Sequence, residues 1–526
     1  QDNSKIKFEY NTAGLLENIQ AKESNTQFTN VVNNFDYIAD GRISRQENSN
    51  GTMTENTYDS MKMHRLARKF TTKEGTAIQD LNYAYDNVGN ILNITDKDKS
   101  TTYTYDDLNR LLSATNTGTN PYTHTFSYNA LGNITTFNNI PYIYDSTEYA
   151  NPHAVTKIGN AAYSYDKNGN LLTNGTQTYT WDYKNRLTNI TSNNLKTTYA
   201  YDYKNQRITT NNGISTTIYP TKYYNEERNK NGKVINTTKH IFDNNGNVVA
   251  SINGKGLNAK VSYIHTDHLG STTHITDTAG QITETNEYYP YGSPINQTGL
   301  EQRKYIGEEY DRDTGLNYLN ARYYNSQTGM FLSQDPLFWN LSESYLLDPQ
   351  QQNSYLYARG NPVSMSDPSG LLTVVVPGTF YNENTWSTQG GAKNFISSVG
   401  KTFGETPVVM NDKTTWSGKN TQEARQSAAT SLAKMINDHK FADGEKLNIV
   451  GHSHGGNVGI LASEMTDKQV DNLVTLGTPN RLMYQPNKNK IENHINVYSR
   501  FDLAQKAAEI GDPVGIVGNN DSRKFS

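Results

Sequence analysis

The chain has 526 residues, no cysteine and a formal net charge of only −4 at pH 7. The length predicts more than one domain. The lack of cysteine excludes disulfides and thiolate metal sites, and the near-neutral charge gives no case for binding nucleic acid or an anionic membrane. Hydrophobic residues are only 34 % of the chain, yet 37 tyrosines stand against 15 phenylalanines. Tyrosine suits a half-buried pleated surface, so we expect much β-sheet.

Two features bear on the context of the chain. It opens QDNSKIKFEY, without an initiator methionine or a signal peptide, so we expect it to be part of a longer protein. It also contains no run of about 20 apolar residues, so the sequence predicts no membrane-spanning segment.

One short unit recurs along the first two thirds of the chain. Its variants include YAYDNVGNILNI, YTYDDLNRLLSA and YSYDKNGNLLTN. Each has an alternating aromatic strand that ends in Asp or Asn, then a Gly/Asn turn and a second short strand. The Asn-Gly and Gly-Asn pairs provide the positive-φ residues that tight hairpins need. Repeats about 20 residues apart predict a quasi-one-dimensional β array, for which a merely structural role is the simplest interpretation.

These units resemble the tyrosine-aspartate (YD) repeats of RHS (rearrangement hotspot) proteins, relatives of teneurins and of insecticidal toxin-complex subunits. The segments 267–294 and 305–337 resemble the RHS-associated core, and NSYLYARGNPVSMSDPSGL (353–371) resembles its end. The resemblance covers residues 1–371. It implies a β-sheet strip that spirals into a hollow shell, with the core closing one end and a variable C-terminal domain, usually a toxin, held inside.

The sequence changes character after residue 371. LLTVVVPGTF (371–380) predicts a buried strand, and TQEARQSAATSLAKMINDHK (421–440) has the periodicity of an amphipathic helix with Thr421 as N-cap. KLNIVGHSHGG predicts a strand that leads into a helix, and further strands are expected at 470–480 and 495–502. Alternating strands and helices predict a mainly parallel α/β sheet.

We therefore expect a multi-domain protein of mixed fold class. An all-β YD-repeat shell, N-terminally incomplete and built as one continuous antiparallel strip, is expected at 1–295. The RHS-associated core with its autoproteolysis motif is expected at 296–371, and an α/β-hydrolase-like toxin domain, C-terminally incomplete, at 372–526.

Ser453 is the candidate nucleophile of the C-terminal domain. It lies in Gly451-His452-Ser453-His454-Gly455, a G-x-S-x-G pattern that follows an apolar strand. Glycines on either side allow the sharp turn that exposes the serine above the sheet. From about residue 372 the chain resembles α/β-hydrolases of the lipase/esterase type. A structural Gly-Ser turn is the alternative.

The resemblance also implies the partners of Ser453. The backbone N–H of His454 and one N–H near Gly378 and Thr379 would form the oxyanion hole, although this chain has Pro377-Gly378 where lipases often have His-Gly. The chain order Ser, acid, His favours Asp502 as the acid, with Asp512 as the runner-up.

The catalytic histidine is the missing member of this set. No histidine follows Asp502, and we expect the base to lie beyond Ser526. Neighbouring side chains at an elbow point away from the nucleophile, so His452 and His454 are poor bases. Two further histidines precede the acid, and structural roles are expected for both: His439 and His494.

Asp335 and Asp367 form the second constellation. In RHS and toxin-complex proteins, paired Asp-Pro motifs form an aspartic autoprotease that cuts just after the second motif. Such chemistry needs two carboxylates close enough to share one proton. Asp367 has the full Asp-Pro-x-Gly motif, whereas Asp335 lacks its glycine. The expected cut lies between Leu371 and Leu372; the alternative is that each Asp-Pro only forms a turn.

Two histidines in HTDHLG, His265 and His268, could suggest metal ligands, but the segment matches the RHS core, and we expect neither a metal nor another cofactor. The sequence as a whole predicts a secreted or delivered bacterial effector. Its shell would enclose a self-cleaved serine hydrolase that attacks esters, most simply lipids, and a cognate immunity protein is the expected partner. The alternative is a non-catalytic delivery or binding scaffold with a degenerate hydrolase domain, which the missing histidine leaves open.

Overall fold

A computed structural model describes most of the chain. The residues outside the description are 1–2, 25, 40, 63, 119, 146–150, 194, 204, 300, 336–351, 368–372, 377–398, 400–407, 411–415, 417–420, 439–446, 479–483, 485, 488 and 498–526. The chain divides into two compact units. The first comprises residues 1–335 and 353–368, and the second comprises 336–352 and 369–526. No helix within the described part has the length and apolar character needed to cross a bilayer.

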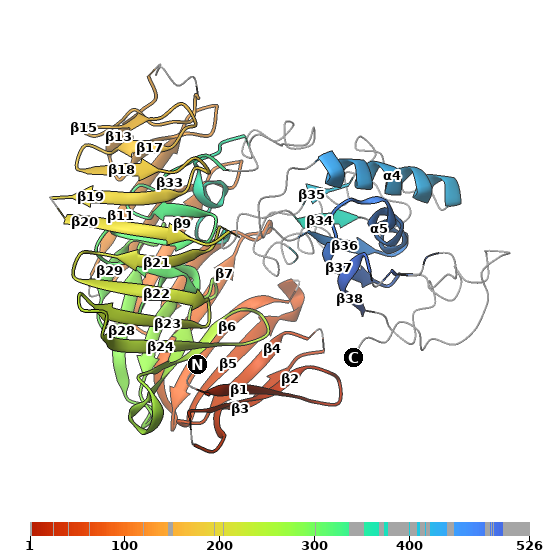
Figure 1. Ribbon diagram of the computed structural model, residues 1–526, viewed down its shortest axis with the longest axis horizontal. Coiled ribbons are helices and arrows are strands. Elements are labelled where there is room, and N and C mark those ends of the chain that lie inside the picture. Colours follow the sequence, from red (N-terminus) through yellow and green to blue (C-terminus); the bar gives the residue numbers. More distant parts are fainter. Residues whose placement is uncertain are drawn as a thin grey trace. The chain divides into compact units, whose positions relative to one another are not determined.

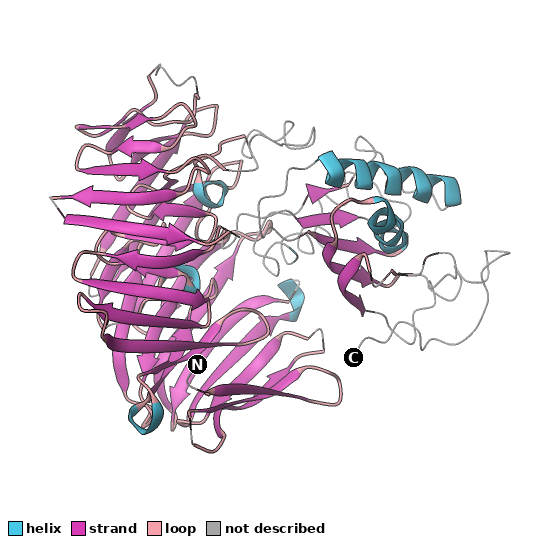
Figure 2. Cartoon of the chain, in the orientation of Figure 1, coloured by secondary structure: helices cyan, strands magenta, loops and turns pink. Residues whose placement is uncertain are grey.

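The first unit is built almost entirely of antiparallel strands that pair in chain order (Figures 1 and 2). Its first sheet contains β1 (Lys5–Tyr10), β2 (Leu16–Lys22), β3 (Thr29–Tyr37), β4 (Ile43–Asn48), β5 (Thr52–Asp59), β6 (Arg65–Lys73), β7 (Thr76–Tyr85), β8 (Ile91–Asp96), β9 (Lys99–Tyr105), β10 (Leu111–Thr117), β11 (Tyr122–Tyr128), β12 (Ile134–Phe137), β13 (Ile140–Ile143), β14 (Lys157–Ile158) and β15 (Ala161–Ala162). Its second sheet contains β16 (Ser164–Tyr165), β17 (Leu171–Thr173), β18 (Gln177–Trp181), β19 (Leu187–Ser192), β20 (Leu195–Tyr201), β21 (Arg207–Asn211), β22 (Ser215–Thr221), β23 (Tyr224–Asn229), β24 (Val234–Phe242), β25 (Val248–Asn253), β26 (Lys260–Thr266), β27 (Thr272–Thr276), β28 (Ile282–Tyr288) and β29 (Pro294–Gln297).

The antiparallel repeat array predicted from the sequence is confirmed, but the prediction of one continuous strip is wrong. Strand pairing stops between β15 and β16, on either side of Tyr163. The backbone N–H of Tyr163 donates to the carbonyl of Thr156 (2.8 Å) instead of entering the next ladder. The neighbouring strands are only two or three residues long, so few ladder bonds oppose the break.

Each repeat fixes its own turn and its own spacing from the repeat before it. In the unit around β7 and β8, Asp86 Oδ1 accepts from the backbone N–H groups of Gly89 (2.7 Å) and Asn90 (2.8 Å), and Gly89 takes the positive φ of 105°. The hydroxyl of Tyr85 donates to the carbonyl of Leu66 (2.8 Å). The same bond to the preceding hairpin recurs in Tyr37–Leu16, Tyr105–Ile91, Tyr128–Leu111, Tyr201–Leu187 and Tyr288–Thr272. Phenylalanine could not make this bond, which explains the excess of tyrosine.

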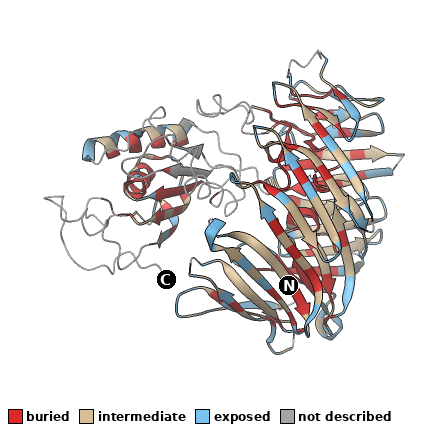
Figure 3. Cartoon of the chain, turned by 180° about the vertical axis from the view of Figure 1, so that it is seen from behind, coloured by how far each residue is buried: buried red, intermediate tan, exposed pale blue. Residues whose placement is uncertain are grey.

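A third, four-stranded sheet lies against the faces of both larger sheets. It contains β30 (Glu309–Asp311), β31 (Leu316–Leu319), β32 (Arg322–Asn325) and β33 (Met330–Phe331). One core cluster joins β7–β13 to three fully buried residues, Tyr291, Tyr324 and Tyr357. Another joins β17–β20 to β31, β32 and Leu332. Figure 3 colours the buried residues of the chain red. Short 3₁₀ turns complete the unit: η1 (Ser60–Lys62), η2 (Gly256–Asn258), η3 (Tyr305–Gly307) and η5 (Tyr357–Gly360).

The second unit contains a parallel five-stranded sheet in the order β35-β34-β36-β37-β38. Its elements are β34 (Thr373–Val376), β35 (Val408–Val409), α4 (Gln422–Asp438), β36 (Asn448–His452), α5 (His454–Met465), β37 (Val470–Leu476) and β38 (Ile491–Val497). The predicted N-cap is confirmed, since Thr421 Oγ1 accepts from the N–H of Ala424 (3.1 Å). The strand predicted at 495–502 instead begins at Ile491, because pairing with β37 sets its start.

Candidate functional site

Asp335 and Asp367 meet at one arginine of the first unit. Nη2 of Arg322, in β32, lies 2.9 Å from Oδ2 of Asp335 and 2.9 Å from Oδ2 of Asp367. Two atoms that are each 2.9 Å from a third lie within twice that distance of each other. The structure therefore brings together two carboxylates that are far apart in the sequence.

The guanidinium of Arg322 is itself firmly held. Its side chain is only 4 % exposed, its Nη1 donates to the carbonyl of Ser354 (3.1 Å), and its carbon lies 3.6 Å from the centre of the Phe331 ring. The same Ser354 carbonyl accepts from the backbone N–H of Asp335 (3.1 Å). Arg322 was missed at the sequence level, because its partners lie far along the chain and leave no local signal beside it.

This arrangement can support acid–base chemistry. The Asp335 and Asp367 side chains remain 27 % and 23 % exposed, and the buried cation offsets the mutual repulsion of the two carboxylates. The residues on either side of the expected cut, Leu371 and Leu372, lie outside the described residues.

Ser453 stands at a sharp turn in the second unit. It follows β36 directly and precedes α5, with φ 52° and ψ −130°, a conformation that is costly for a residue with a Cβ. Its backbone N–H donates to the carbonyl of Leu476 at the end of β37 (2.8 Å). His454 is the first residue of α5, so its backbone N–H lies at the N-terminus of the helix, where the helix dipole favours an anion.

Close approach of α5 to the sheet makes two glycines necessary. A Cβ on Gly451 would lie 2.4 Å from the Cα of Gly456, and a Cβ on Gly456 would lie 1.9 Å from Oγ1 of Thr478. The tight contacts thus involve Gly451 and Gly456. The sequence motif had drawn attention to Gly451 and Gly455.

The partners predicted for Ser453 are only partly described. His494 lies in β38, is buried, and its Nε2 is 2.9 Å from Oγ1 of Thr475, so its ring is engaged within the sheet. His452 is exposed at the end of β36, and His454 is buried in α5. Five further candidates lie outside the described residues: Gly378, Thr379, His439, Asp502 and Asp512.

Each of the two histidines of HTDHLG lies within hydrogen-bonding distance of another residue of the first unit. Nε2 of His265 lies 3.0 Å from Oγ1 of Thr276, and burial lowers the pKa of His265 to about 3. Nε2 of His268 lies 2.7 Å from the carbonyl of Val363. Within the described part of the chain, no group of three or more Asp, Glu or His side chains converges as metal ligands would.

The two parts of the chain match two different protein families. Residues 3–363 match the Teneurin YD-shell family, and residues 396–510 match a family described as Alpha/beta hydrolase.

Similar proteins include the tRNA3(Ser)-specific nuclease WapA of Bacillus spizizenii, 29 % identical over 41 % of this chain and 9 % of its own length. The toxin subunit YenC1 of Yersinia entomophaga is 25 % identical over 70 % of this chain and 45 % of its own length. The crystal structure of TcdB2-TccC3-TEV matches 70 % of this chain and 20 % of that one, with a TM-score of 0.59 and 23 % identity. This chain thus spans less than half of each relative. The YD-shell match covers most of the chain, which belongs to the Teneurin YD-shell family.

Proposed function

We propose that this chain is part of a YD-shell toxin whose C-terminal domain, from about residue 372, is a serine hydrolase of the α/β-hydrolase type. The reaction class is hydrolysis of an ester bond, and lipid esters are the first substrates to test. Ser453 is the nucleophile, Asp502 orients the base, and the N–H of His454 forms half of the oxyanion hole, with Thr379 providing the other half.

The observation that carries this proposal is the backbone of Ser453. A non-glycine residue at φ 52° and ψ −130°, between a buried parallel strand and a helix, has the backbone conformation expected of a nucleophile elbow. Strain of this kind persists where the surroundings enforce it, and it is common at functional sites. The match of residues 396–510 to an alpha/beta hydrolase family adds to it.

Release of this domain is the second part of the proposal. Asp335 and Asp367 act as an aspartic autoprotease that cuts between Leu371 and Leu372, with one carboxyl as acid and the other as base. Arg322 is a positioning residue, since its Nη2 contacts both carboxylates. The cut separates the hydrolase domain, from residue 372, from the shell at 1–295 and the core at 296–371.

The biological setting follows from the relatives. Several similar proteins are described as toxins or toxin subunits, among them Tse5 of Pseudomonas aeruginosa and YenC1. We therefore propose that this protein is secreted or delivered into a target cell as an effector, and that the producing cell makes an immunity protein against the hydrolase. A scaffold with a degenerate hydrolase domain is the competing function.

Labelling with a fluorophosphonate probe distinguishes the two functions, because the probe reacts only with an activated serine. The protein should be expressed from its complete natural reading frame and the labelled peptide mapped by mass spectrometry. We expect label on Ser453, loss of label in Ser453→Ala, and full label in Ser427→Ala. Ser427 is an exposed serine of α4 in the same unit.

A folded protein that gives no label and no hydrolysis of p-nitrophenyl esters would favour the scaffold. The cut is tested separately on a denaturing gel. The parent protein should run as two pieces, and Asp335→Asn and Asp367→Asn should each run as one. Cleavage after Leu371 in both variants would rule out the aspartic mechanism.

A further inference from the structure

A polar trough crosses the second sheet of the first unit. It has a volume of about 720 Å³. Its lining residues come from nine consecutive strands, β20 to β28, together with Asn212, residues 299 and 301–302, and residues 309–314. Adjacent strands are about 4.8 Å apart, so a cavity that crosses nine strands is elongated. Asn236, Arg312 and Asp313 are exposed, and the trough therefore opens to solvent.

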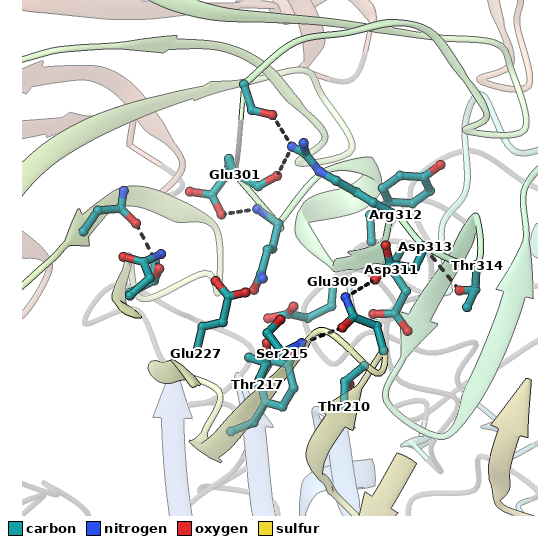
Figure 4. Close-up of a pocket in the computed structure, with 18 of the residues that line it drawn as sticks. Thr210, Ser215, Thr217, Glu227, Glu301, Glu309, Asp311, Arg312, Asp313 and Thr314 are labelled. Atoms are coloured by element: carbon teal, nitrogen blue, oxygen red, sulfur yellow. Dashed lines mark hydrogen bonds between the residues drawn. The ribbon is translucent and has the colours of Figure 1, made fainter. Parts of the chain in front are cut away.

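The lining of this trough is unusual for a sheet face turned toward a core. Threonine, serine and asparagine occupy most of the strand positions, and Ile275 is the one aliphatic residue among those that line it. Figure 4 shows Ser215, Thr217 and Glu227 on the strand side, with Glu301 and Arg312 opposite. Such a surface suits an extended hydrophilic ligand and does not suit an apolar one.

Carboxylates outnumber cations along the trough. Six of them line it: Glu227, Glu284, Glu301, Glu309, Asp311 and Asp313. Arg312 is the one lining cation, and its Nη2 donates to the carbonyls of Gly299 and Glu301.

Three further cations contact these carboxylates from behind and do not line the trough. Arg207 lies 2.7 Å from Asp311, Arg303 lies 3.4 Å from Glu309 and Lys304 lies 3.1 Å from Glu284. Their side chains are at most 6 % exposed. Four cations against six carboxylates leave an excess of two negative charges, which a ligand with at least two positive charges would balance.

Two side chains on the strand side lack partners, which a ligand would supply. Thr217 is only 8 % exposed, and its hydroxyl makes no hydrogen bond to the described residues. The half-buried carboxylate of Glu227 has neither a hydrogen bond nor a cation within 4.0 Å in the described part of the chain. Both groups line the trough and are therefore available to a ligand that enters it.

The chemistry of the trough selects among ligands. A divalent metal is disfavoured, because the described residues contain no converging group of three or more ligating side chains. Anions are excluded by the charge, and flat apolar molecules by the hydroxyl lining. We infer that the trough binds a linear polyamine, whose ammonium groups, spaced along a flexible chain, match carboxylates spread along the trough.

Isothermal titration of the complete protein with spermidine tests this inference. The matched variants are Glu227→Gln and Glu226→Gln. Glu226 is the neighbouring residue of β23, it is paired with Arg228 (2.6 Å) and Lys255 (3.3 Å), and it does not line the trough. We expect saturable binding that weakens about tenfold in Glu227→Gln, equivalent to about 1.4 kcal/mol, and that is unchanged in Glu226→Gln. Thr217→Val, which keeps the shape of the side chain, should also weaken binding.

The remaining outcomes are decisive as well. A magnesium salt at equal ionic strength should not reproduce the binding heat; if it does, the effect is ionic strength alone and the inference is wrong. Equal affinity in the parent and Glu227→Gln, with both folded by circular dichroism, would also overturn it. A trilysine peptide provides the second arm. If it displaces spermidine, the natural ammonium groups can be lysine side chains of a peptide. If it does not, they belong to a free polyamine.

Discussion

Arg322→Ala is the substitution that best tests the carboxylate pair. The guanidinium contacts both Asp335 and Asp367 at 2.9 Å through one nitrogen. Without it, two negative charges remain less than twice that distance apart. At an effective dielectric constant of about 20, charges at this separation repel by about 3 kcal/mol. We expect Arg322→Ala to lower the stability of the first unit by about that amount and to stop cleavage.

A second substitution separates the electrostatic effect from the catalytic one. In the Arg322→Ala background, Asp367→Asn removes one of the two charges and should recover most of the lost stability. It should not recover cleavage, because one member of the pair is gone. Arg322→Lys is the matched control: it keeps the positive charge and should keep most of the stability. Its single ammonium cannot reproduce the bond to Ser354 and both carboxylate contacts, so cleavage should be partial.

Thermal unfolding and a denaturing gel measure the two effects on the same samples. If Arg322→Ala costs the same stability with and without Asp367→Asn, the arginine does not act by neutralising the pair. If Arg322→Ala cleaves as fast as the parent protein, Arg322 has no positioning role.

Three further predictions concern the elbow and the pH dependence. Ser453→Gly removes the nucleophile but relieves the strained φ of 52°, so it should raise the unfolding temperature by an amount equivalent to about 1 kcal/mol. Gly456→Ala places a Cβ 1.9 Å from Thr478 Oγ1 and should lower the free energy of unfolding by about 3 kcal/mol. Adding Thr478→Gly should restore part of this stability. Burial lowers the pKa of His240 and His265 from 6.5 to about 3. Between these pH values the unfolded chain binds more protons than the folded chain. By pH 4.5, each histidine should therefore lower the free energy of unfolding by about 3 kcal/mol.

These predictions can each fail in a specific way. An unchanged or lower unfolding temperature in Ser453→Gly would mean that the elbow is not strained. No recovery with Thr478→Gly would mean that the clash lies elsewhere. Unfolding temperatures that do not fall between pH 6.5 and pH 4.5, or a fall that His240→Gln leaves unchanged, would contradict the burial argument.

The repeats were predictable because each one contains the residues that determine its own strand and turn. The strand, the aspartate that caps the turn and the positive-φ residue lie within a few positions of one another, as around Asp86 and Gly89. The break at Tyr163 was not predictable, because it depends on which carbonyl that residue's N–H meets after two very short strands. The start of β38 was missed for a similar reason. Glu492, Asn493 and His494 are all polar and show no apolar alternation, and their pairing with β37 makes them part of the strand.

The candidate sites also differ in how far local sequence could predict them. The sharp turn at Ser453 could be predicted because strand, glycine and serine are adjacent in the sequence. The role of Ser453 as a nucleophile stays a prediction. Asp335 and Asp367 were singled out through a family resemblance, and their shared arginine could not be found from spacing at all. The trough was missed because its carboxylates belong to different strands and loops, and within each segment an acidic residue looks like an ordinary solvated one.

The same local bonding that defines the repeat explains how such a polar face can exist. In this family member, turn aspartates cap their own loops and tyrosine hydroxyls bond to the preceding hairpin, so each repeat satisfies much of its own polar surface. Stability therefore depends less on a continuous apolar face than in an ordinary β-sandwich. In the stretch from β20 to β28, threonine, serine, asparagine and glutamate line the trough while the antiparallel ladder continues unbroken. The side chains on a face of such an array can therefore be polar and suited to a ligand while the strand order stays fixed.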